Sequence, residues 1–145
     1  MNEVPNLVAT KNSTGDYYRI ADLMKHAGEL QHFLLEGGFA MGCMLGECSL
    51  LCSYDALFPK TYWEFFEADR KGDLANLWRL HVLINDVDFF SELPRSMIDG
   101  SYDKILLWLS NPKFPTRMLP PYIGLSADEL AACRRKYEAQ YAHIR

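Results

Sequence analysis

The sequence lacks an apolar run long enough to cross a bilayer. The longest runs, such as residues 50–52 and 105–109, fall far short of the roughly 20 residues that a spanning helix needs. The N-terminus lacks the basic and apolar segments of a signal peptide. A net charge of −4 and a pI of about 5.5 argue against a surface for nucleic acid or for an anionic membrane. We therefore expect no membrane or nucleic-acid partner and a cytoplasmic location.

The spacing of the cysteines follows no familiar pattern. Four cysteines in 145 residues do not form the disulfide framework of a small secreted protein. Cys43, Cys48 and Cys52 lie close together and could ligate a metal with His32 or Glu47, but the chain has no Cys-x-x-Cys pair and no zinc-knuckle spacing. We interpret these cysteines as small buried side chains and expect neither a metal nor a cofactor.

The length and composition are those of one globular domain. Hydrophobic residues make up 49% and charged residues 23% of the 145 positions, which excludes a disordered chain. The chain is too short for a complete TIM barrel, which takes about 250 residues.

The first 58 residues predict a β-α-β-α-β order. Short apolar runs at residues 6–10, 32–35 and 49–53 are typical of buried parallel strands, with Lys11 ending the first run. An amphipathic helix is expected from Tyr17 to Ala27, ended by Gly28, and a short helix through Met41 and Met44.

Residues 59–145 predict successive helices. Pro59 suits the first turn of a helix through the aromatic residues 62–66, which we interpret as core or subunit interface. Gly72 and Asp73 break that helix, and the next is expected over residues 74–93, ended by Pro94. A shorter helix follows over 101–109, then a proline-rich connector and a last helix that begins with a capping box at residues 126–129.

Three features could carry chemistry from their local pattern alone. Lys11 follows a predicted strand, where ligands of parallel α/β folds collect, and a desolvated lysine there can form a Schiff base. The alternative is an ordinary solvated lysine. The turn at residues 13–16 could bind an anion or simply cap the next helix, and Gly37–Gly38 could admit a ligand or form a tight turn.

Three segments in order resemble the C-terminal half of the dihydrodipicolinate synthase / N-acetylneuraminate lyase family. Residues 8–16, Val-Ala-Thr-Lys-Asn-Ser-Thr-Gly-Asp, are similar to the family's sixth barrel strand and the turn after it. Residues 34–38, Leu-Leu-Glu-Gly-Gly, are similar to the seventh strand, and residues 45–53 followed by Pro59 to the eighth. The connector Arg117-Met-Leu-Pro-Pro121 and the helices around it resemble the family's tail.

The resemblance implies an α/β fold: the last three units of a TIM (β/α)8 barrel over residues 1–58, and the final barrel helix with a C-terminal helical bundle over residues 59–145. It implies that Lys11 forms an imine with pyruvate or another 2-keto acid, that Gly37 lines the site, that a backbone carbonyl at Leu51 faces the lysine, and that Ser53 contacts the substrate's tail. The implied protein is a class I lyase or aldolase that needs no cofactor and forms homo-oligomers.

The resemblance also implies what the chain does not supply. Family members hold the 2-keto acid carboxylate with a Ser/Thr pair and relay protons through a tyrosine, and both come from the N-terminal half. Glu47, Cys48 and Ser49 replace a small-residue run of the family. We therefore expect activity to require an N-terminal half-barrel chain, or an in-frame upstream continuation if Met1 is not the true start. Two alternatives stay open: an inactive truncated or split-gene remnant that serves only as an oligomerisation or interaction module, and an unrelated small α/β domain that binds a ligand at the Gly15 and Gly37 turns.

Overall fold

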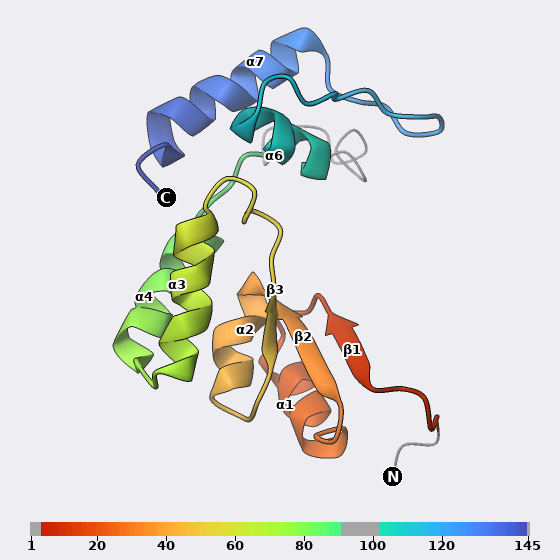
Figure 1. Ribbon diagram of the computed structural model, residues 1–145, viewed down its shortest axis with the longest axis vertical. Coiled ribbons are helices and arrows are strands. Elements are labelled where there is room, and N and C mark those ends of the chain that lie inside the picture. Colours follow the sequence, from red (N-terminus) through yellow and green to blue (C-terminus); the bar gives the residue numbers. More distant parts are fainter. Residues whose placement is uncertain (1–3, 91–101, 145) are drawn as a thin grey trace. The chain divides into compact units, whose positions relative to one another are not determined.

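The computed structural model describes residues 4–90 and 102–144, and it divides into two compact units (Figure 1). Unit 1 comprises Met1–Cys52 and Tyr62–Asp86, and unit 2 comprises Ser53–Thr61 and Val87–Arg145. The helix end expected at Pro94 and the helix start expected at Ser101 lie outside the described residues. The expected domain boundary after residue 58 stays a prediction.

Unit 1 contains a three-stranded, fully parallel sheet in the order β1-β2-β3. The strands are β1 (Ala9–Asn12), β2 (Gln31–Leu35) and β3 (Ser49–Leu51). Lys11 pairs with Phe33, and Phe33 pairs with Ser49, so these three residues form one row across the sheet. The predicted mixed α/β order of the first half is therefore confirmed.

The first strand begins three residues later and ends two residues later than its apolar run predicts. Leu7 and Val8 are exposed and precede the strand, because pairing begins where the Gln31 amide donates to the Val8 carbonyl at 3.0 Å. The apolar character of a run does not determine which of its residues finds a strand partner.

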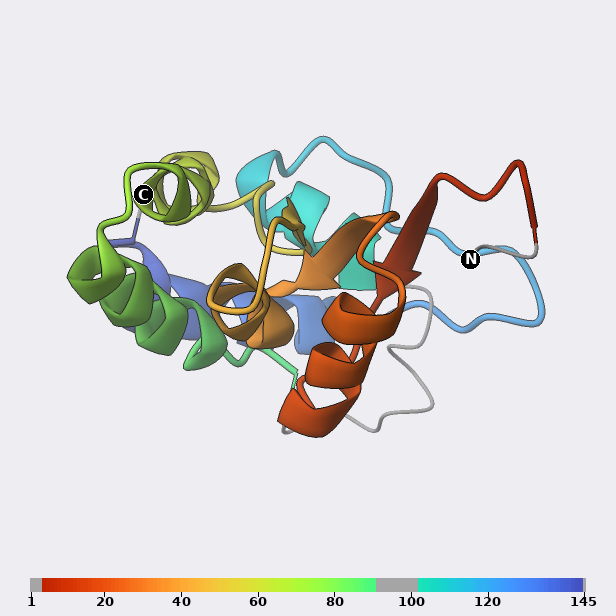
Figure 2. The same cartoon turned by 90° about the horizontal axis from the view of Figure 1, so that it is seen from below.

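Two helices cover one face of the sheet, α1 (Tyr17–His26) and α2 (Glu36–Cys43) (Figure 2). Asp16 caps α1 by accepting from the Arg19 amide at 3.0 Å, and the helix ends at His26, with Ala27 as its C-cap directly before Gly28. The fully buried apolar residues on this covered side include Ile20, Leu34, Phe39 and Ala40.

Two further helices, α3 (Pro59–Arg70) and α4 (Leu74–Asn85), form a helical hairpin through Gly72. Gly72 has a φ of 67°, which L residues with side chains rarely adopt, and Asp73 caps α4 through the Asn76 amide. The helix expected to reach residue 93 ends at Asn85. Asp88 instead accepts from the Phe90 amide at 3.1 Å, a local turn that competes with helical pairing.

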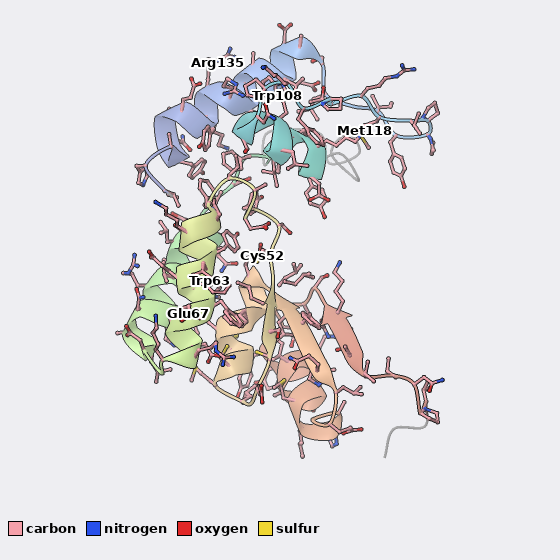
Figure 3. The ribbon with its side chains drawn as sticks, in the orientation of Figure 1. Cys52, Trp63, Glu67, Trp108, Met118 and Arg135 are labelled. Carbon is pink, nitrogen blue, oxygen red and sulfur yellow. The ribbon has the colours of Figure 1, made fainter. Side chains whose placement is uncertain are left out.

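Unit 2 contains α6 (Tyr102–Ser110), α7 (Ala127–Lys136) and a π-helical turn, η1 (Tyr137–Tyr141). The capping box predicted at residues 126–129 is present in full. The Arg134 guanidinium lies 4.5 Å from the ring centre of Trp108, which Figure 3 labels on α6, and it donates to the Trp108 carbonyl at 3.1 Å. These contacts join α7 to α6 by a charged group stacked on an aromatic face.

Within residues 4–90 and 102–144, no helix has both the length and the apolar character required to span a membrane.

Candidate active site

The site is built on the face of the sheet opposite α1 and α2. Successive strand residues point to opposite faces, so the row Lys11, Phe33 and Ser49 points away from the face where Leu34 is fully buried. Lys11 is exposed and Phe33 is 37% exposed. A hydrogen bond of 3.2 Å from Gln31 Nε2 to Ser49 Oγ confirms that these two side chains share this face. We call this side of the sheet the open face.

Lys11 and Leu51 lie at the same end of the sheet, where the strands end. Lys11 is the penultimate residue of β1 and Leu51 is the last residue of β3. Because the strands are parallel, their C-terminal ends lie at one end of the sheet. Parallel α/β sheets bind their ligands at this C-terminal end. The direction of the strands therefore places Lys11 at the end of the sheet where ligands of such folds bind.

The turn after β1 packs against the start of α2. A Cβ added to Gly38 would lie 2.7 Å from the Thr14 carbonyl oxygen, and one added to Gly15 would lie 3.7 Å from the Gly37 carbonyl oxygen. The two glycine-containing segments that the sequence singled out thus meet in space. β2 ends at Leu35 and α2 begins at Glu36, so Gly37 and Gly38 belong to the first turn of α2, directly after the strand.

The polar turn at residues 12–16 is organised by its own side chains. Asn12 Oδ1 accepts from the Thr14 amide at 3.1 Å, and Thr14 Oγ1 accepts from the Asp16 amide at 3.0 Å. With the Asp16 cap, these bonds use three amides near the start of α1. The capping interpretation is therefore confirmed for this turn.

A buried histidine on the covered side of the sheet contacts β1. His32, 1% exposed, lies between Thr10 Oγ1 at 2.7 Å from its Nδ1 and the Ala27 carbonyl at 2.8 Å from its Nε2. Since a carbonyl only accepts, Nε2 carries a proton. Thr10 is thereby held toward the covered side, and its neighbour Lys11 points to the open face.

A polar cluster next to Gly37 stabilises the junction between β2 and α2. Its members are Glu36, Tyr62, His81 and Asn85. Glu36 is 8% exposed and its Oε1 accepts from the Tyr62 hydroxyl at 3.1 Å, while Asn85 Nδ2 donates to the Glu36 carbonyl at 3.4 Å. Burial lowers the pKa of His81, and its interaction with the Glu36 backbone opposes this shift. The cluster holds the backbone that leads into Gly37.

The sequence did not reveal His32, Tyr62 and Asn85 as supports of the site. Tyr62 was expected in an aromatic core, and it is indeed buried together with Phe65, whereas Trp63 on α3 is 64% exposed (Figure 3). The partners are 22 to 49 residues apart in the chain, so no local spacing could show these contacts.

The predicted site residues fall in both units. Lys11, Gly37 and Leu51 belong to unit 1, whereas Ser53 is the first residue of unit 2. Across the two described stretches of chain, no three His, Cys, Asp or Glu side chains gather closely enough to hold a metal ion.

The sequence matches no protein-family model and no curated protein, whereas solved structures match over nearly the whole chain. YagE of E. coli K12, a prophage protein of the dihydrodipicolinic acid synthase family in complex with pyruvate, aligns with a TM-score of 0.76 and 14% identity, covering 97% of this chain and 47% of YagE.

Two further structures give the same result. A putative dihydrodipicolinate synthetase from Pseudomonas aeruginosa aligns with a TM-score of 0.69 and 20% identity, over 94% of this chain and 46% of that one. A putative dihydrodipicolinate synthase family protein from Coccidioides immitis aligns with a TM-score of 0.67 and 20% identity, over 98% and 48%. The chain spans about half the length of each structure, and it therefore has the fold of about half of a dihydrodipicolinate synthase family protein.

Proposed function

We propose that this chain is the C-terminal part of a Schiff-base-forming lyase or aldolase that acts on pyruvate or another 2-keto acid, with Lys11 as the nucleophile. The observation that carries the proposal is the position of Lys11 at the C-terminal end of β1, on the open face of a sheet whose fold matches a pyruvate-bound protein. Gly37, Leu51 and Ser53 are the proposed substrate-binding residues.

The chemistry follows from the lysine amine. The neutral Nζ of Lys11 attacks the keto carbon, and the resulting carbinolamine loses water. The iminium ion accepts the electron pair released when a bond to the adjacent carbon breaks, and the enamine so formed donates that pair when a new bond forms at this carbon. Lys11 is exposed in this chain, and a desolvated environment favours the neutral amine that attack requires. The surface that desolvates it must therefore lie over the open face.

We propose that an N-terminal half-barrel provides this surface and completes a TIM (β/α)8 barrel. Among the described strands, β1 and β3 each pair only with β2, so each offers a free edge, and each matched structure is about twice as long as this chain. Closure of a barrel removes both edges and buries the open face. The C-terminal helices would contribute the contacts of a homo-oligomer.

Borohydride trapping tests the nucleophile. The chain, alone and mixed with a complementary N-terminal half-barrel from a matched family member, is incubated with pyruvate and borohydride, and peptides are identified by mass spectrometry. We expect a 1-carboxyethyl adduct on Lys11, stronger in the mixture. Lys11→Arg should abolish it, whereas Lys25→Arg, at an exposed position near the end of α1, should leave it unchanged. No adduct at Lys11 in the mixture refutes the nucleophile.

A second candidate function is a non-catalytic remnant that serves as an interaction module. The exposure of Lys11 favours it, because a solvated lysine lacks the environment that favours the neutral amine. The in-frame DNA upstream of the Met1 codon separates the two readings. A continuation or a neighbouring gene that encodes further β-α units supports the enzyme, and the absence of both supports the remnant.

A further inference from the structure

Two cysteine thiols of unit 1 lie in contact at the end of the sheet remote from Lys11. Cys43 is the last residue of α2, Cys48 immediately precedes β3, and their Sγ atoms are 3.7 Å apart. Both are free thiols. From the sequence, these cysteines were interpreted as small buried side chains in preference to metal ligands, and a five-residue spacing does not show that the loop brings Cys48 back to Cys43.

The two sulfurs form a directed chain of hydrogen bonds. The Cys48 thiol donates to the Phe39 carbonyl at 4.0 Å, so its sulfur is free to accept from the Cys43 thiol. This hydrogen bond with Cys48 is the largest cause of the raised pKa of Cys43, followed by burial. Cys43 is half-buried whereas Cys48 is 6% exposed, so reagents from solvent reach Cys43 first.

We propose that Cys43 and Cys48 are a dithiol site that closes to a reversible disulfide by exchange with a low-molecular-weight disulfide of the glutathione type. The Cys43 thiolate attacks one sulfur of the reagent and expels one thiolate, which leaves a mixed disulfide on Cys43. The Cys48 thiolate then attacks the Cys43 sulfur and expels the second thiolate. The protein loses two electrons and two protons, and one reagent disulfide becomes two thiols.

The local structure permits this closure. The sulfurs must approach from 3.7 Å to about 2.05 Å, and the loop that must adjust, residues 44–47, is exposed throughout. The residues between the two cysteines can therefore adjust at the surface. The Asp69 carboxylate also raises the pKa of Cys43, but within the residues described it does not join the two sulfurs in a group that could hold a metal ion, which favours bond formation over metal binding.

The test treats the full chain with glutathione disulfide, blocks remaining thiols with iodoacetamide and maps peptides by mass spectrometry. We expect one intramolecular bond between Cys43 and Cys48, reversed by dithiothreitol, with Cys52 and Cys133 alkylated. The double variant Cys52→Ser/Cys133→Ser should close normally, since neither residue takes part. Cys48→Ser should stop at a mixed disulfide between Cys43 and glutathione.

Two further readouts separate closure from incidental oxidation. Because the pKa of Cys43 is raised, the rate of closure should increase about tenfold per pH unit. The oxidised chain should unfold several degrees higher, since the bond restricts the unfolded chain. If Cys48→Ser fails to fold, Cys43→Ser replaces it, and Cys48 should then stay unmodified. A mixed disulfide that persists on wild-type Cys43, or a bond from Cys43 to Cys52, would overturn the proposal.

Discussion

The two faces of the sheet in unit 1 differ sharply in what covers them. On one face, Leu34 and His32 are at most 1% exposed beneath α1 and α2; on the other, Phe33 is 37% exposed and Lys11 is exposed. Adjacent residues of a single strand therefore have opposite environments. The covered face holds unit 1 together, and the open face carries apolar side chains whose burial requires a surface that these helices do not provide.

The largest expected effect comes from truncation on the covered face. Leu34→Ala should lower the free energy of unfolding by about 2–5 kcal/mol, because it leaves a cavity between β2 and α2. Urea denaturation followed by circular dichroism measures this loss. A cost below about 1 kcal/mol would show that α2 does not pack firmly on the sheet and would remove the contrast between the faces.

Gly38→Ala should destabilise the chain by about 1–3 kcal/mol, because the new Cβ would meet the Thr14 carbonyl oxygen at 2.7 Å, a contact with backbone. Gly37→Ala is the matched control, since its Cβ would meet only the side-chain Oδ1 of Asn85 at 3.4 Å. The same denaturation assay should separate the two. Equal costs would show that the turn after β1 does not lie against α2.

The pH dependence of stability tests His81, a member of the polar cluster next to Gly37. His81 has a folded-state pKa below its ordinary value of 6.5 because of burial, so the unfolded chain binds a proton more readily. Stability should therefore decrease as the pH falls below about 6.5 toward the folded-state pKa. Thermal unfolding of wild type and His81→Gln from about pH 8 to about pH 5 measures this difference. Parallel curves for the two proteins would contradict it.

The smallest expected effect lies on the open face. Phe33→Ser should change the free energy of unfolding of the isolated chain by less than about 1 kcal/mol, because the ring is already partly in water. The same change should weaken binding of a complementary half-barrel, measured by calorimetric titration. A large loss of stability in the chain alone would show that this face is already packed.

The sequence predicted element order better than element position. Continuous apolar runs located all three strands, and capping residues located the starts of α1 and α7, because these signals are local. The start of β1 and the end of α4 were misplaced. The first depends on pairing with Gln31 and the second on the turn at Asp88, and neither is visible in apolar periodicity.

The candidate site likewise has one part that local sequence signals predicted and one part that they did not. The motif around Lys11 was visible because strand, lysine and capped turn are consecutive in the chain. The supports at His32, Tyr62 and Asn85 were not, since each hydrogen-bonds a residue 22 or more positions away. The close approach of Gly38 to the Thr14 carbonyl oxygen could not be predicted either, because the two residues lie far apart in the sequence.

The purely parallel pairing of the sheet also bears on how fast it can assemble. No two strands are joined by a tight turn: Ala9 pairs with Gln31, 22 residues later (31 − 9), and Phe33 pairs with Ser49, 16 residues later (49 − 33). The entropy of closing these two loops differs by only about 0.3 kcal/mol, so neither pairing has a clear lead over the other. Both pairings join residues distant in the chain, and refolding should therefore be slower than in a helical protein of this length.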